Sequence, residues 1–131
     1  MDQKLIERAF KNLENAYAPY SNYRVGACVK CKDGRMFDGA NIENASYGLT
    51  NCGERTAVFA AYACGVRKDD IEALAIVTEG NRIGAPCGAC RQVLSELLNQ
   101  DTPIYLANRT EMKVTTIAEL LPFQFSDEDL K

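Results

Sequence analysis

Three cysteines in two short stretches have the spacing to hold one metal ion. "PCGAC" (86–90) places Cys87 and Cys90 at a predicted helix start, where residues three apart share a face with Cβ atoms about 5–6 Å apart. Two sulfurs so placed can bind one zinc ion at about 2.3 Å each. Cys52, in "NCGERTA" (51–57), also falls in a predicted first helical turn. Three thiolates leave tetrahedral zinc one open position, as in catalytic zinc sites.

Glu54, two residues after Cys52, suits proton transfer at such an ion. Helical side chains lean towards the N-terminus, so its carboxylate can reach back over the helix start and act as a proton shuttle there. A structural interpretation stays open, in which Asn51 caps the helix and Glu54 completes a capping box. The chain has no histidine, which excludes Ser-His-Asp and Cys-His catalysis as well as histidine ligands.

The other cysteines do not fit a shared metal site. Cys28 and Cys31 form a second C-x-x-C pair, but they lie in a predicted strand, where residues three apart point to opposite sides of the sheet. We expect them to be buried packing residues. Cys64 lies at the far end of the helix that begins near Cys52, so it is badly placed as a fourth ligand. Taken alone, "PCGAC" also fits a redox dithiol or half of a structural zinc site.

The elements that position these residues follow from apolar spacing. Residues 3–17 predict an amphipathic helix, whose stripe comprises Leu5, Ile6, Ala9, Phe10, Leu13 and Tyr17. We predict strands at 23–31, 35–42, 71–78, 103–108 and 112–116, and helices at about 52–64, 86–100 and 117–121. The continuous apolar run 71–78 is typical of a central strand covered on both faces.

This order of elements predicts an α/β fold with three layers, α/β/α, around a mixed five-stranded sheet. We expect a single domain over residues 1–131. The helices that carry Cys52 and Cys87 would begin at the carboxyl ends of strands, where open α/β sheets usually bind ligands.

Composition narrows the partners and the compartment. The net charge of −3 and the scattered basic residues argue against a nucleic-acid polymer, although a nucleoside remains compatible. No apolar run is long enough to span a bilayer, and the N-terminus does not look like a signal peptide. We therefore expect no membrane contact, a cytoplasmic location and reduced cysteines.

Several stretches together resemble the small homotetrameric zinc-dependent cytidine deaminase family. They lie in the family order along nearly the whole chain: "YAPYSNYRVGA" (17–27), "NIENASYG" (41–48), "NCGERTA" (51–57), "PCGACRQV" (86–93) and "ELLPFQFSDEDL" (119–130). The resemblance implies hydrolytic deamination of cytidine and 2′-deoxycytidine to uridine and 2′-deoxyuridine plus ammonia, in pyrimidine salvage. It also implies a cytidine deaminase-like fold.

The resemblance assigns roles around the metal. Cys52, Cys87 and Cys90 would hold one Zn²⁺ per subunit, and Glu54 would be the general acid/base that serves N3 of the base and the departing ammonia. Three thiolates make zinc a weaker Lewis acid, so their charge must be compensated. The family similarity gives that role to Arg55, and the two helix N-termini add to it.

The resemblance also assigns substrate contacts. Asn41 and Glu43 would hold the ribose hydroxyls, and the Gly53 N–H would meet the pyrimidine carbonyl. Tyr23 would pack near the base or sugar. This chain departs from the family at two of these positions, since phenylalanine is more usual at 23 and alanine at 53.

Phe125 matches an aromatic residue that family members place over the base in a neighbouring subunit's site. This implies a homotetramer with shared active sites, whereas a simpler interpretation has Phe123 and Phe125 anchoring the tail. Two other functions stay open: a zinc deaminase acting on a modified cytosine nucleoside, and a zinc- or thiol-redox binding module that gains nothing from Glu54.

Overall fold

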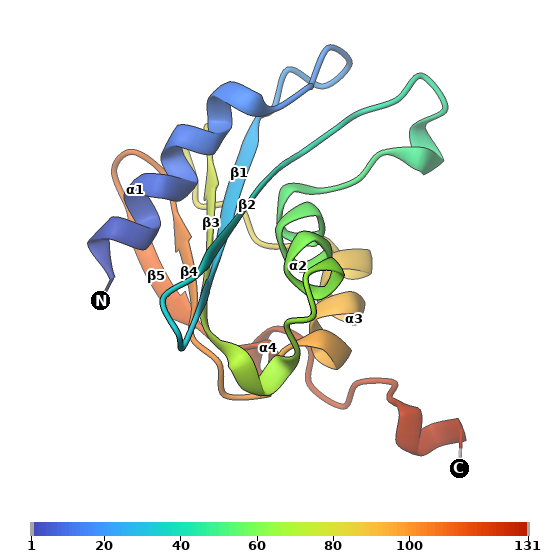
Figure 1. Ribbon diagram of the computed structural model, residues 1–131. Helices are drawn as coiled ribbons and strands as arrows, with labels where there is room; N and C mark the ends of the chain where they lie inside the picture. The colour runs from blue at the N-terminus through green and yellow to red at the C-terminus, as the bar shows by residue number, and fades with distance from the viewer. Residues whose placement is uncertain (1, 131) are drawn as a thin grey trace.

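A five-stranded sheet forms the middle layer of the computed structural model, which describes residues 2–130 (Figure 1). The strand order is β2-β1-β3-β4-β5, and only the β3–β4 pair is parallel. The strands are β1 (Val25–Cys31), β2 (Met36–Ala40), β3 (Ile71–Thr78), β4 (Ile104–Ala107) and β5 (Met112–Thr115). The predicted mixed five-stranded sheet is thus confirmed.

The topology brings two helix starts to one edge of the sheet. β1 lies between β2 and β3 and is antiparallel to both, so β2 and β3 run in the same direction and end at the same edge. α2 (Gly53–Ala63) follows β2 along the chain, and α3 (Gly88–Leu97) follows β3. The N-termini of both helices therefore meet where these strands end, as the sequence predicted.

Apolar clusters cover both faces of the sheet. α1 (Gln3–Lys11) packs on one face, whereas α2, α3 and α4 (Ile117–Leu120) pack on the other (Figure 1). Seven of the eight β3 residues are buried, which confirms β3 as a central strand. Cys28 belongs to the α1-side cluster and Cys31 to the opposite one. Both are buried packing residues that face away from each other.

The predicted helix at 3–17 is wrong in its second half. α1 ends at Lys11, and a short 3₁₀ turn, Asn12–Asn15, follows it. The buried Asn12 amide donates to the backbone oxygen of Ala27 (2.9 Å), which ties this turn to β1. Tyr17 consequently leaves the helical stripe, is 54% exposed, and pairs as an isolated bridge with Ile42.

Two helix boundaries also differ from the prediction. Asn51 does not cap α2: the N-cap is Cys52, with no side-chain cap bond, while the Asn51 amide donates to Thr56 Oγ1 (3.2 Å). No capping box therefore involves Glu54. Pro86 precedes α3 rather than opening it, because Cys87 is the N-cap, and residues 98–100 lie beyond its end. None of the helices within residues 2–130 has the length and apolarity needed to cross a lipid bilayer.

β2 packs so closely on α2 that a methyl group added at Gly39 should destabilise the fold. A Cβ added at Gly39 would lie 2.4 Å from the Gly53 carbonyl oxygen and 2.5 Å from the Ala57 nitrogen. We expect Gly39→Ala to lower the free energy of unfolding by about 1–3 kcal/mol, because α2 must move to admit the methyl group. Urea denaturation measures this. Gly48→Ala is the control, since a Cβ there meets nothing within 4 Å, and equal midpoints for the two variants would contradict the expectation.

Candidate active site

Three cysteine sulfurs meet at the two converging helix starts. Cys52 and Cys87 are the N-caps of α2 and α3, and Cys90 lies in the first turn of α3. Their sulfurs all lie within 4.8 Å of one another, and those of Cys52 and Cys87 are 3.9 Å apart. A tetrahedral zinc ion bound at about 2.3 Å would place its sulfur ligands about 3.8 Å apart. The geometry of the cluster therefore fits zinc.

The ionisation of these thiols points to the same conclusion. The pKa of Cys52 is lowered to about 5, chiefly by its hydrogen bond with Cys90 and further by Arg55 and Cys87. The pKa of Cys90 is raised, because it shares that bond with a thiolate and is buried. The Cys52 thiolate thus opposes ionisation of Cys90, and a cation bound between the sulfurs would offset that repulsion. Soft thiolate ligands in a tetrahedral set favour zinc.

Arg55 faces this sulfur cluster. Its Nη2 donates to Cys52 Sγ (3.5 Å), and its Nε is buried without a hydrogen-bond partner within residues 2–130. Its guanidinium is therefore placed to draw charge from the sulfurs. Arg91 does not share this position: it donates to the backbone oxygens of Pro86 and Leu120, each at 2.7 Å, and so ties the start of α3 to the end of α4.

Glu54 lies beside the cluster in the first turn of α2 and is only 4% exposed. Burial raises the pKa of its carboxyl group, and the Cys52 thiolate adds to the shift. A carboxyl group with a raised pKa holds and releases a proton more readily near neutral pH. The environment of Glu54 therefore suits a general acid/base.

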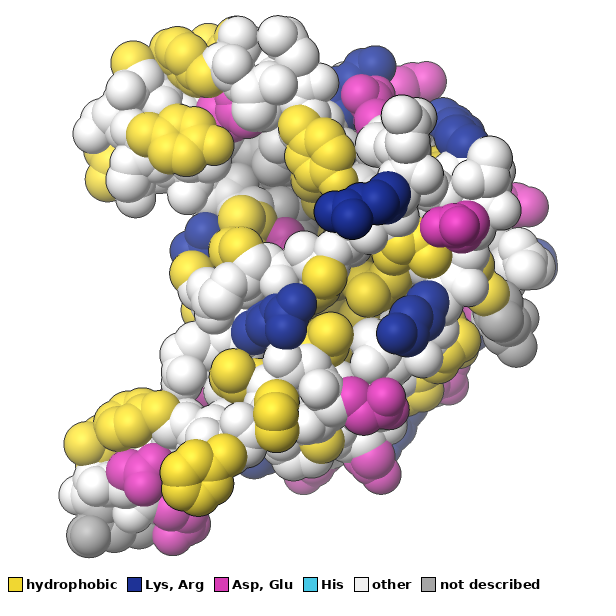
Figure 2. Space-filling view, turned by 180° about the vertical axis from the view of Figure 1, so that it is seen from behind, with side chains coloured by type: hydrophobic (Ala, Val, Ile, Leu, Met, Phe, Trp, Pro, Cys, Tyr) yellow, Lys and Arg dark blue, Asp and Glu magenta, His cyan; other side chains and the backbone are white. Residues whose placement is uncertain are grey.

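A pocket of about 210 Å³ joins these groups to the predicted substrate residues. Two loops, residues 17–24 and 41–50, pair through backbone hydrogen bonds of Tyr17 with Asn41 and Glu43. The surface is hollowed beneath the lobe that these paired loops form (Figures 1 and 2). The predicted residues that line the pocket are Tyr23, Asn41, Glu43, Cys52, Glu54 and Cys87. Sequence reasoning missed Ser21, Tyr47, Thr50, Thr78 and Gly84, which also line it. Of these, Ser21 lies in "YAPYSNYRVGA" (17–27) and Tyr47 in "NIENASYG" (41–48), so both had a local signal.

Asn41 and Glu43 are buried polar residues, 7% and 4% exposed. The Asn41 amide accepts from the Val25 N–H (2.9 Å) and donates to the Tyr23 backbone oxygen (2.9 Å). Glu43 accepts three hydrogen bonds from residues 20 and 21. Both side chains thus hold the first paired loop and face the pocket.

The two positions that depart from the family each have a close neighbour. The Tyr23 hydroxyl makes no hydrogen bond within the described residues and lies over Gly84, where an added Cβ would be 2.5 Å from it. Gly53 opens α2, and a Cβ there would lie 3.1 Å from Val25 Cγ1 and 3.4 Å from the Asn41 nitrogen. An alanine at position 53 would therefore press on Val25 at the start of β1.

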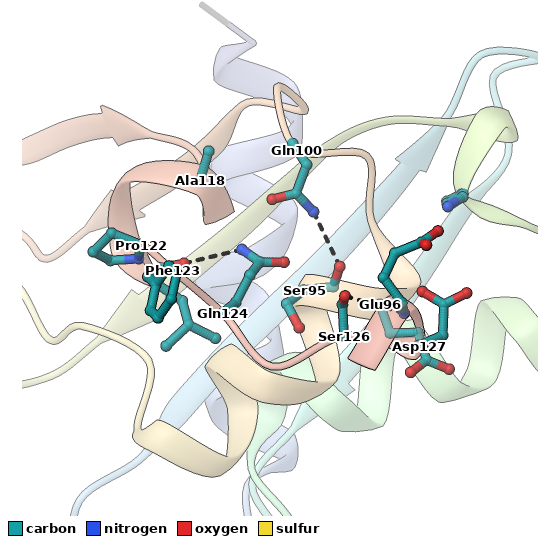
Figure 3. Close-up of a pocket in the computed structure, with 12 residues that line it drawn as sticks. Ser95, Glu96, Gln100, Ala118, Pro122, Phe123, Gln124, Ser126 and Asp127 are labelled. Carbon is teal, nitrogen blue, oxygen red and sulfur yellow. Dashed lines mark hydrogen bonds between the residues drawn. The ribbon is translucent and has the colours of Figure 1, made fainter. Parts of the chain in front are cut away.

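Phe125 is not brought to this pocket. It lies in the C-terminal tail, 58% exposed, with its backbone oxygen accepting from Gln92 Nε2 (3.0 Å). The tail borders a larger cavity of about 540 Å³ next to α3 and α4, lined in part by Ser95, Gln100 and Phe123 (Figure 3). That cavity contains no cysteine, so it is separate from the sulfur cluster.

A mixed sheet with three thiols and a buried carboxylate at two helix starts defines the class of zinc-dependent deaminases of cytosine compounds. Residues 1–106 match the family model described as the cytidine and deoxycytidylate deaminase zinc-binding region. The chain belongs to this family.

Named relatives cover nearly the whole chain. It is 52% identical to a cytidine deaminase of Halalkalibacterium halodurans, over 98% of this chain and 96% of the relative. It is 48% identical to a cytidine deaminase of Sporosarcina psychrophila, over 98% and 93%. The crystal structure of cytidine deaminase from Burkholderia pseudomallei superposes with a TM-score of 0.91 and 49% identity, covering 95% of this chain and 100% of that one. These matches confirm the predicted family and fold.

The ligand assignment can be tested by zinc content. We expect Cys52→Ala and Cys90→Ala each to reduce bound zinc from about one per chain to a small fraction of that, because catalytic zinc sites have three protein ligands and each variant keeps only two. Inductively coupled plasma mass spectrometry of the purified proteins measures this. Cys64→Ala is the control, since Cys64 is exposed at the other end of α2. Loss of zinc in the control, or its retention in both ligand variants, would refute the assignment.

Proposed function

We propose that this protein is a cytidine deaminase that converts cytidine and 2′-deoxycytidine to uridine and 2′-deoxyuridine. The oxygen of one water molecule forms a bond to C4 of the base, the bond from C4 to the amino nitrogen breaks, and ammonia leaves. The observation that carries this proposal is the buried Glu54 carboxylate next to a sulfur cluster of zinc dimensions.

Each residue of the site has a separate task. Cys52, Cys87 and Cys90 would hold zinc, which when bound supplies Lewis-acid activation of water. Glu54 would accept one proton from the water and donate it to N3 of the base, then take the second proton from the oxygen now bound to C4 and deliver it to the departing amino nitrogen. Arg55 draws negative charge from the cysteine sulfurs, so that zinc held by three thiolates would keep enough Lewis acidity to activate water.

The rest of the pocket supports a nucleoside as substrate. Asn41 and Glu43, which line the pocket, would hold the sugar hydroxyls. The N–H of Gly53, in the first turn of α2, would meet the pyrimidine carbonyl. Tyr23 offers an aromatic surface at the rim. Among the described residues that line the pocket there is no lysine or arginine, the side chains that commonly pair with phosphate groups. This favours the nucleoside over the nucleotide.

We further propose that four copies of this single catalytic domain assemble and share active sites. The paired loops and the tail carry large exposed apolar side chains, including Tyr47 (64% exposed), Leu49 (73%) and Phe125 (58%). The apolar side chains of the projecting tail are visible in Figure 2. Such surfaces are typical of protein interfaces. Phe125 does not line the pocket of its own subunit, so it is available to a neighbouring subunit. We place the enzyme in the cytoplasm, in pyrimidine salvage.

Replacement of Glu54 tests the mechanism. We expect Glu54→Gln to lower kcat for cytidine by about 10²–10⁴-fold, because the amide cannot carry the proton, while zinc content stays at about one per chain. Glu14→Gln, at an exposed carboxylate of the 3₁₀ turn, should keep wild-type turnover. Undiminished turnover in Glu54→Gln would sink the mechanism.

Mixed oligomers test the sharing of sites. Phe125→Ala subunits keep Glu54, and Glu54→Gln subunits keep Phe125, so only shared sites can combine the two intact residues. We expect a refolded mixture to exceed the average activity of the two parent proteins. Activity equal to that average at every mixing ratio would show that the subunits work independently.

A further inference from the structure

Glu43 is a buried carboxylate without a cationic partner within the described residues. It is 4% exposed, and no lysine or arginine pairs with it. Its Oε1 accepts from the backbone N–H groups of Tyr20 (2.9 Å) and Ser21 (3.1 Å), and its Oε2 accepts from the Ser21 hydroxyl. A buried charge must be hydrogen-bonded to be tolerated. These three bonds provide that stabilisation, and all of them come from the first paired loop.

Ser21 has a second contact that fixes its hydroxyl. Ser21 Oγ accepts from the Tyr23 N–H (3.0 Å), in the local turn that serines commonly form with the residue two positions on. The one proton of the hydroxyl is left for Glu43 Oε2. Asn22, between them, has a φ of 58°, a left-handed conformation that asparagine tolerates better than most residues. The loop is therefore shaped so that Ser21 points at Glu43.

Counting acceptor positions shows what remains for a ligand. A carboxylate offers about four lone-pair positions, two on each oxygen. Two positions on Oε1 and one on Oε2 are filled, which leaves one position on Oε2. Ser21 and Glu43 both line the pocket, so this last position is the one available to a hydroxyl group of a bound molecule.

We infer that Ser21 is a positioning residue, which orients Glu43 so that Oε2 accepts from a single hydroxyl group of the sugar. This inference rests on the proposed function and adds a residue to its sugar-binding site. Ser21 acts through Glu43: without its hydroxyl, Oε2 has two open positions and the carboxylate is free to turn. Discrimination between sugars that carry or lack the recognised hydroxyl then falls.

Steady-state kinetics of Ser21→Ala with cytidine, 2′-deoxycytidine and 3′-deoxycytidine test this inference. One of the two deoxy compounds lacks the recognised hydroxyl, and wild-type enzyme should bind it worst. We expect Ser21→Ala to raise KM about tenfold for the two substrates that keep the hydroxyl, as for one hydrogen bond to a charged group. For the third substrate KM should change less than about twofold, and kcat should stay near the wild-type value for all three.

Two further variants separate positioning from folding. Ser21→Thr keeps a hydroxyl and should restore the wild-type KM pattern. Ser46→Ala removes an exposed serine hydroxyl from the other paired loop, one that makes no hydrogen bond within residues 2–130, and should leave all constants unchanged. A uniform loss on the three substrates, or no change in Ser21→Ala, would overturn the inference while wild-type turnover upholds the deaminase function. Absence of turnover by the wild type would overturn that function, and this inference with it.

Discussion

The active site depends on two helix starts being held at one fixed separation. Cys52 comes from α2 and Cys87 and Cys90 from α3, and zinc needs all its sulfur ligands at about 2.3 Å. Neither helix can supply a tetrahedral set alone. The sheet fixes their separation because β2 and β3 end at the same edge, and because Gly39 lets β2 lie directly against the first turn of α2. The middle layer is thus the frame of the metal site.

Charge is the second constraint on this site. Three thiolates around Zn²⁺ carry a net charge of −1, and Glu54 adds another negative group when ionised. Arg55 and the positive ends of α2 and α3 offset part of this charge, and burial favours the neutral form of Glu54. Because no basic residue within the described chain lines the pocket, the compensation comes from behind the sulfurs rather than from the substrate side. A neutral substrate therefore enters a pocket with no basic side chain among its described lining residues.

The sequence predicted those parts of the fold that depend on local pattern. Alternation placed Cys28 and Cys31 on opposite faces, and the apolar run 71–78 marked the central strand; both predictions are confirmed. The errors arose where tertiary contacts determine the residue at which a helix begins or ends. Asn12 bonds to β1 and ends the first helix early, and Asn51 pairs with the loop after β2 instead of capping α2.

The sequence predicted some residues of the site and missed others, for the same reason. Cysteine spacing and the family resemblance identified the sulfur cluster and Glu54, which the structure brings together, whereas their roles remain predictions. Thr78 and Gly84 carry no sequence signal, because they reach the pocket only through the path of the chain from β3 to α3. Ser21 lay in a recognised stretch, yet its contact with Glu43 spans two loops and cannot be read from spacing. Long-range polar contacts are thus the part that sequence pattern leaves undetermined.

Glu43 and Glu54 show how one residue type acquires opposite properties within a single pocket. Both are 4% exposed. Hydrogen bonds from Ser21 and Tyr20 stabilise the charged form of Glu43 and lower the pKa of its carboxyl group. Burial beside the Cys52 thiolate instead raises the pKa of Glu54. The first environment keeps a permanent acceptor for a hydroxyl group, and the second keeps a group that exchanges protons, which is the division of roles that pairs of carboxyl groups take when their environments separate their pKa values.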